Sequence, residues 1–189
     1  DHNELMKYHE GLIVCSACIA GEVPRRILAN DIAKAEETIL WYKNLFGDDY
    51  YLELQRHEVK DPAQRANRDT FPEQQRANVE LIRLAQKHNV KLICSNDVHF
   101  VDAENAEAHD RLLCLGTSRD IDDPARMLYS KQEWFKTRAE MNEVFSDVPE
   151  ALQNTCEICD KVEMYDIDHA PIMPNFDIPE SFGTEEGYK

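Results

Sequence analysis

Long hydrophobic runs are absent from this sequence, and positively charged residues are few. No stretch approaches the roughly 18 consecutive apolar residues that a membrane span requires, and no secretory signal peptide precedes the first helical sequence. Hydrophobic types make up 42% of the 189 residues and charged types 31%, which is typical of a soluble globular protein with enough apolar side chains for a core. The length allows one domain or one and a half.

The shortage of positive charge limits the partners that this chain can bind directly. The 37 Asp and Glu residues outnumber the 21 Lys and Arg residues, so the formal net charge is −16. Such an acidic surface repels the phosphate backbone of nucleic acids. We therefore do not expect a free-standing DNA-binding protein. Membership of a nucleic-acid enzyme whose basic groove lies in another domain is compatible with this charge.

The six cysteines include two C-x-x-C pairs, Cys15 with Cys18 and Cys156 with Cys159. This spacing occurs in zinc ribbons and redox-active proteins. Here the first pair follows an apolar strand, where positions three apart face opposite sides, and most of the chain separates it from the second pair. We expect free thiols in a reducing cytoplasm rather than a shared zinc knuckle. Cys18 is the exception, for reasons given below.

Three short apolar runs alternate with helical patterns in the first 117 residues. Ile32, Ala35 and Ile39 illustrate the helical spacing. Strands are expected over 12–17, 50–54 and the start of 91–100, and helices over 2–10, from Pro24, and over 31–46, 73–88 and 103–115. Residues 58–72 read as a long loop. Buried strands that alternate with helices predict an α/β fold with a parallel sheet.

Chemically active side chains occur where these strands end. Right-handed crossovers bring the carboxyl ends of parallel strands to one rim, where we expect Cys18, Glu53 with His57, and Asp97 with His99. Residues two apart on an extended chain project to the same side, so Asp97 and His99 could offer an oxygen and a nitrogen ligand to a divalent metal. The alternative is a plain strand-end turn, with Asp97 capping the next helix and His99 merely exposed.

The sequence changes character beyond Gly116. Asp120, Asp122 and Asp123 resemble a cation-binding cluster but lack the glycine and the terminal glutamate of a Ca²⁺ loop, so a solvated turn is expected. Short helices are predicted over 138–145 and 150–162. From Tyr165 onward, repeated prolines predict an extended strap or linker that leads to further structure.

Several ordered segments resemble one known family. They are Gly11-Leu-Ile-Val-Cys-Ser-Ala-Cys-Ile-Ala-Gly-Glu-Val-Pro, Tyr51-Leu-Glu-Leu-Gln-Arg-His, Ser95-Asn-Asp-Val-His-Phe and Ala106-Glu-Ala-His-Asp-Arg-Leu-Leu-Cys. The resemblance is to the alpha-subunit family of bacterial replicative (family C) DNA polymerase III, within its N-terminal "polymerase and histidinol phosphatase" (PHP) domain. It continues through 121–124 and 148–155 to 173–176 and so covers nearly the whole chain.

The resemblance implies a partial PHP-type (β/α)7 barrel. Residues 1–117 would carry its last three strands, and residues 118–189 would form a helical segment and an extended linker toward the polymerase core. Because the chain starts at Asp1 rather than Met and enters helical sequence at once, we expect it to be a piece of a longer protein.

The resemblance also implies a metal centre. Its late ligands match Cys18, Asp97 and His99, and its early ligands should lie upstream of this chain. A thiolate, a carboxylate and an imidazole suit Zn²⁺, with Mn²⁺ or Mg²⁺ as alternatives. Glu53 and His57 would either orient the ligands or a bound water, or form a structural ion pair with Arg56.

The implied activity is DNA synthesis by the parent polymerase, with 3′–5′ exonuclease proofreading associated with the PHP site. The implied partners are DNA, bound through other domains, the sliding clamp and a proofreading subunit. A stand-alone PHP-type phosphoesterase would share the strand order and the Asp-x-His pair. A non-catalytic scaffold that only braces the polymerase is a third possibility.

Three strands cannot close a barrel, so the missing half should leave apolar surface exposed. We therefore predict that this chain alone either dimerises or buries that face by rearrangement. We also predict that it binds metal weakly or not at all.

Overall fold

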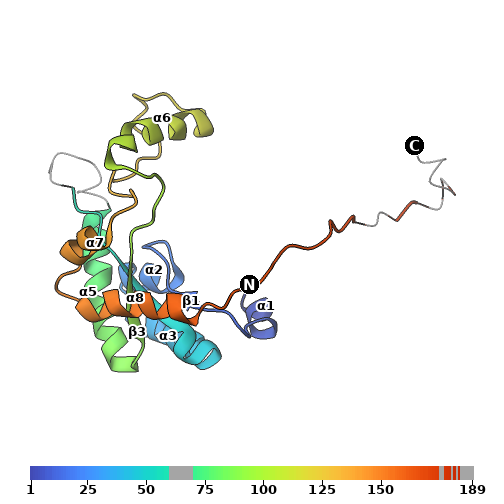
Figure 1. The fold of residues 1–189 in the computed structure, drawn as a ribbon, viewed down its shortest axis with the longest axis horizontal. Coiled ribbons are helices and arrows are strands. Elements are labelled where there is room, and N and C mark those ends of the chain that lie inside the picture. Colours follow the sequence, from blue (N-terminus) through green and yellow to red (C-terminus); the bar gives the residue numbers. More distant parts are fainter. Residues whose placement is uncertain (60–69, 175–176, 180, 182, 184–189) are drawn as a thin grey trace.

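A computed structural model describes residues 1–59, 70–174, 177–179, 181 and 183. Within these residues the chain forms one open, parallel sheet with the strand order β1-β2-β3 (Figure 1). The strands are β1 (Val14–Cys15), β2 (Tyr50–Gln55) and β3 (Lys91–Ser95). The predicted α/β fold with three parallel strands is confirmed, and the open sheet is consistent with part of a PHP barrel.

Helices connect and cover these strands much as the apolar spacing predicts. The predicted loop 58–72 falls mostly on residues 60–69, which lie outside the described part. Asp31 begins α3 by accepting a hydrogen bond from the Lys34 amide, and Gly47, with φ +58°, ends it. The helices are α1 (His2–Lys7), α2 (Glu22–Leu28), α3 (Ile32–Phe46), α5 (Phe71–His88), α6 (Ala106–Thr117), α7 (Arg138–Val144) and α8 (Pro149–Lys161), with short 3₁₀ turns at Gly47–Asp49 and Ala103–Asn105.

The central strand β2 is buried along its length, as predicted. Successive residues of a strand face opposite sides, so Tyr50, Leu52 and Leu54 pack into a core formed with α2, α3 and α5. Strand β1 is only half-buried and much shorter than predicted. After Cys15 the strand cannot continue far, because Ala17 adopts φ +61° and turns the chain out of the extended conformation.

Helix α8 lies against the free edge of β3 (Figure 1). The Asn154 side-chain amide donates to the Leu92 carbonyl at 2.9 Å, and the Cys94 amide donates to the Thr155 hydroxyl at 3.2 Å. Side chains of α8 thus satisfy backbone groups that would otherwise need a neighbouring strand. The division at residue 117 remains a prediction, although Phe145 and Ala151, both beyond it, belong to the same core as β2.

Replacing Thr155 with Val tests this edge cover. The substitution keeps the side-chain shape but removes the hydroxyl that accepts the Cys94 amide. We expect the free energy of unfolding to fall by about 1 kcal/mol, measured by urea denaturation, because a buried donor loses its partner. Thr155→Ser keeps the hydroxyl and should lose less; equal or greater loss in Thr155→Ser would assign the effect to the methyl group.

Helix α6 stands apart from the sheet, and the chain beyond α8 runs away from the body in an extended form (Figure 1). Asp110 of α6 forms a mostly buried, bidentate ion pair with Arg126. Asp123 accepts hydrogen bonds from Arg119 and from the Ala125 amide, which is the geometry of a turn. No helix in the described part is long and apolar enough to cross a membrane.

Candidate functional site

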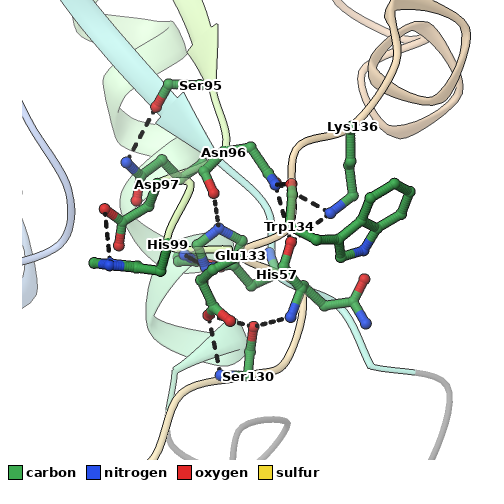
Figure 2. Close-up of polar contacts among 12 residues, drawn as sticks. His57, Ser95, Asn96, Asp97, His99, Ser130, Glu133, Trp134 and Lys136 are labelled. Carbon is green, nitrogen blue, oxygen red and sulfur yellow. Dashed lines mark hydrogen bonds and ion pairs between the residues drawn. The ribbon is translucent and has the colours of Figure 1, made fainter. Parts of the chain in front are cut away.

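The loop after β3 is held beside a distant segment of the chain. The amides of His99 and Phe100 donate to the carbonyl oxygen of Glu133 at 2.8 and 3.4 Å, and the Phe135 amide donates to the Phe100 carbonyl at 3.1 Å. A parallel bridge pairs Phe100 with Trp134. Residues 133–135 therefore pair with the loop that follows β3, and this segment runs beside the loop in Figure 2.

Asp97 and His99 lie side by side at this end of the strand. His99 Nε2 is 3.4 Å from Asp97 Oδ1, and both side chains are partly exposed (Figure 2). Asp97 itself adopts φ +46°, a left-handed conformation that a short polar side chain tolerates better than most. The rings of Tyr129 and His109 pack against His99, with centroids 4.5 and 5.7 Å away. The pair thus presents one carboxylate and one imidazole to solvent.

Cys18 lies beyond β1 and lines a small notch with Glu53, Gln55 and Asn78. The notch has a volume of about 10 Å³, enough for about one water molecule. The turn that carries Cys18 needs glycine at position 21, because a Cβ atom there would lie 2.1 Å from the Ser16 carbonyl oxygen.

Glu53 connects this notch to β3. One oxygen of its carboxylate accepts hydrogen bonds from the Ser95 hydroxyl and from the Gln55 side-chain amide, the latter at 3.1 Å. Ser95 is the residue before Asn96, so Glu53 lies between the surroundings of Cys18 and the loop that carries Asp97.

The donor residues expected from the sequence do not form a complete metal site in the described part of the chain. Within the residues that the structure describes, no three His, Cys, Asp or Glu side chains are arranged to hold one ion. Asp97 and His99 form a pair, whereas Cys18 does not complete a three-donor group with them. An oxygen and a nitrogen donor suit a divalent cation chemically, but two donors leave most of its coordination to other groups.

His57 is buried beneath the loop, with 3% of its side chain exposed. The side-chain oxygen of Gln74 accepts a hydrogen bond from the His57 backbone amide at 2.8 Å. The side-chain nitrogen of Gln74 therefore faces His57 Nδ1 at 3.1 Å and donates to it. His57 Nε2 must then carry the proton, which it donates to the Asn96 carbonyl at 3.2 Å. Burial lowers the pKa of His57 and keeps the ring neutral.

Arg56 does not pair with Glu53 or His57, so the alternative of a structural ion pair with Arg56 is wrong. The guanidinium instead binds both carboxylate oxygens of Asp147, at 2.5 and 2.9 Å, and lies 5.1 Å from the centre of the Phe145 ring. His57 instead forms a hydrogen bond with the backbone carbonyl of Asn96 in the loop.

Sequence reasoning missed the acidic and polar groups of residues 129–136. Glu133 is 2% exposed, and its Oε1 accepts from the Ser130 amide at 3.0 Å and from the Ser130 hydroxyl at 2.5 Å (Figure 2). Ser-x-x-Glu is the sequence pattern of a helix capping box, and this pattern can be recognised in the sequence. No helix follows here, because Lys131 adopts φ +66° and turns the chain.

Burial also shifts the pKa values of other groups in this part of the molecule. It raises the pKa of Tyr129, and the negative charges of Asp97 and Glu133 add to that effect. Burial lowers the pKa of Lys136, whose ammonium contacts the Asn96 side-chain oxygen at 3.3 Å. The thiols of Cys15 and Cys94 have pKa values raised to about 11 and about 12, so neither is a thiolate at neutral pH.

Comparison with known proteins shows which proteins this chain is similar to. Residues 1–57 match the PHP domain model. The DNA polymerase III subunit alpha of Borreliella burgdorferi is 41% identical over 186 residues, 97% of this chain, and that of Pseudomonas aeruginosa is 36% identical over 178 residues, 94% of this chain. The chain is homologous to the region of DNA polymerase III alpha subunits that contains part of the PHP domain.

The match covers only part of each polymerase subunit. The chain spans 15% of the Borreliella burgdorferi alpha subunit and 14% of the Pseudomonas aeruginosa one. Cys18, Glu53 and His57 lie within the PHP match, whereas Asp97 and His99 lie beyond it, in the stretch shared with the alpha subunits.

Proposed function

We propose that this chain contributes Asp97 and His99, with Cys18, to a divalent-metal phosphoesterase centre of a DNA polymerase III alpha subunit. The supporting observation is the juxtaposition of Asp97 and His99, 3.4 Å apart and open to solvent at the carboxyl end of β3. Zn²⁺ suits the three donors best, and Mn²⁺ or Mg²⁺ are alternatives. The remaining ligands would come from sequence outside this chain.

The proposed reaction is hydrolysis of a phosphodiester at a 3′ end of DNA, as in 3′–5′ exonuclease proofreading. A divalent metal, when bound, lowers the pKa of a water molecule and stabilises charge on the phosphate. In this chain, Asp97 and His99 would bind the metal. The buried, neutral His57 would hold the loop in place through its hydrogen bond to the Asn96 carbonyl. Glu53 would fix the neighbouring Ser95 rather than react itself.

The whole protein would be a cytoplasmic DNA polymerase, in which residues 1–117 belong to the PHP domain and residues 118–189 lead toward the polymerase core. With a net charge of −16, this part is unsuited to grip DNA, so DNA would bind through other domains. The sliding clamp and a proofreading subunit are the other partners that we propose.

Metal content and nucleotide release test this function in the full-length protein. We expect Asp97→Asn to lower both the bound metal and the metal-dependent release of 3′ nucleotides. Asp168→Asn is the matched control, because Asp168 lies on the extended chain beyond α8 and precedes a histidine too. Equal metal content and equal rates in Asp97→Asn and the unaltered protein would refute the proposal.

A second candidate is a non-catalytic scaffold within the polymerase. It is favoured by the incomplete donor set, since no third metal-binding side chain of the described residues joins Asp97 and His99. In that case the full-length protein would hold no stoichiometric metal and would release no nucleotides at this site, whatever residue stands at position 97.

A further inference from the structure

We propose that residues 129–136, here called the brace, hold the loop that carries Asp97 and His99 in place. Glu133 is the residue of the brace that positions this loop. The proposal deepens the proposed function, because the brace would set the geometry of two suggested metal ligands. Its structural claim, that Glu133 holds the loop in place, can be tested without any metal.

The first contact is through the backbone. The Glu133 carbonyl accepts the His99 amide at 2.8 Å, so one of the two suggested ligands is attached directly to the brace. The Phe135 amide donates to the carbonyls of Phe100 and Val101, both at 3.1 Å, and prolongs the attachment beyond the site. The loop therefore cannot shift without breaking hydrogen bonds to the brace.

The second contact fixes the residue before Asp97. The Asn96 side-chain amide donates to the carbonyls of Gln132 and Trp134, at 2.9 and 2.8 Å, and its oxygen accepts from Lys136 (Figure 2). The Asn96 carbonyl accepts from His57. Asp97 thus lies between two residues, Asn96 and His99, that the brace holds by hydrogen bonds.

The third observation concerns the Glu133 side chain. It points inward, with Oε1 bound to Ser130 and 3.5 Å from Nδ1 of His57, which accepts rather than donates, while Oε2 is buried without a partner in the described structure. A buried carboxylate with an unsatisfied oxygen costs free energy, so stability alone does not explain it. The Glu133 carboxylate fixes Ser130, and with it the backbone of Glu133, in position beneath the loop.

A similar Ser/Thr-x-x-Glu arrangement elsewhere in the chain provides a matched control. The Thr137 amide and hydroxyl donate to Glu140 at 2.8 and 2.7 Å, at the start of α7 and directly after the brace. Glu140→Ala removes equivalent hydrogen bonds from an exposed position.

The test is amide hydrogen exchange at His99 and Phe100 in the full-length, metal-free protein. We expect Glu133→Ala to speed exchange there at least tenfold relative to α3 amides, Glu140→Ala to leave it unchanged, and Glu133→Gln, which keeps an oxygen for Ser130, to restore most protection. If Glu133→Ala does not fold, Ser130→Ala compared with Thr137→Ala decides. Exchange at His99 and Phe100 that equals the control overturns the proposal.

Co²⁺ binding, followed by its visible absorption, gives a second measurement. We expect Glu133→Ala to weaken Co²⁺ binding at least tenfold while Glu140→Ala does not. If the unaltered protein binds no Co²⁺, the proposed metal function fails, and hydrogen exchange alone still decides whether the brace holds the loop.

Discussion

Replacing Phe145 with Ala is expected to lower the free energy of unfolding by about 3–5 kcal/mol, the usual cost of deleting a fully buried aromatic ring. Phe145 follows α7 directly, has no exposed surface, and belongs to the core built around β2. The Arg56 guanidinium lies over its ring and also binds the Val144 carbonyl. The substitution would leave a cavity and remove the support of that arginine.

Thermal or urea unfolding, followed by circular dichroism, measures this loss. Phe135→Ala is the matched control, because the Phe135 ring is 69% exposed and its removal should change stability by less than about 0.5 kcal/mol. Because Phe145 lies beyond residue 117 yet packs with β2, the loss should appear in a single transition shared by sheet and helices. Two separate transitions, with only the weaker one shifted, would show instead that the segment after residue 117 folds independently.

Much of the fold could be predicted because its signals are local. The helical spacing of Ile32, Ala35 and Ile39 and the apolar run of β2 identify elements within a few residues of their ends. Asp97 and His99 lie close together as their spacing predicts, but not for the expected reason, because Asp97 has φ +46° and the chain is not extended there. Such features depend on chain geometry, which neighbouring residues determine.

The parts that could not be predicted depend on contacts between distant residues. Nothing in the sequence of α8 shows that Thr155 bonds to β3, because the pairing joins positions far apart in the chain. Ser130 and Glu133 match the sequence pattern of a helix start, yet in the structure the Glu133 carboxylate faces His57 from a distant part of the chain. Cys18 was grouped with Asp97 and His99 by topology, whereas its side chain lines a notch with Glu53.

Stability is expected to fall as the pH is lowered through the range in which histidine titrates, and His57 should account for part of the loss. Burial lowers the pKa of His57 in the folded state because it removes water from the charged ring, and this outweighs the Glu133 carboxylate and the hydrogen bond to the Asn96 carbonyl, which both raise the pKa. The unfolded chain, with a histidine pKa of about 6.5, therefore binds a proton at a higher pH than the folded chain does.

The contribution of His57 is complete above the unfolded pKa and is lost as the pH falls from that value toward the lowered folded pKa. A single proton gives a slope of at most about 1.4 kcal/mol per pH unit. Urea denaturation between pH 7.5 and 5 should show this slope reduced in His57→Gln. His169→Gln, on the extended chain beyond α8, should keep the slope of the unaltered protein. An identical slope in His57→Gln would mean that His57 takes up a proton while folded, and Glu133 would then be its ion-pair partner.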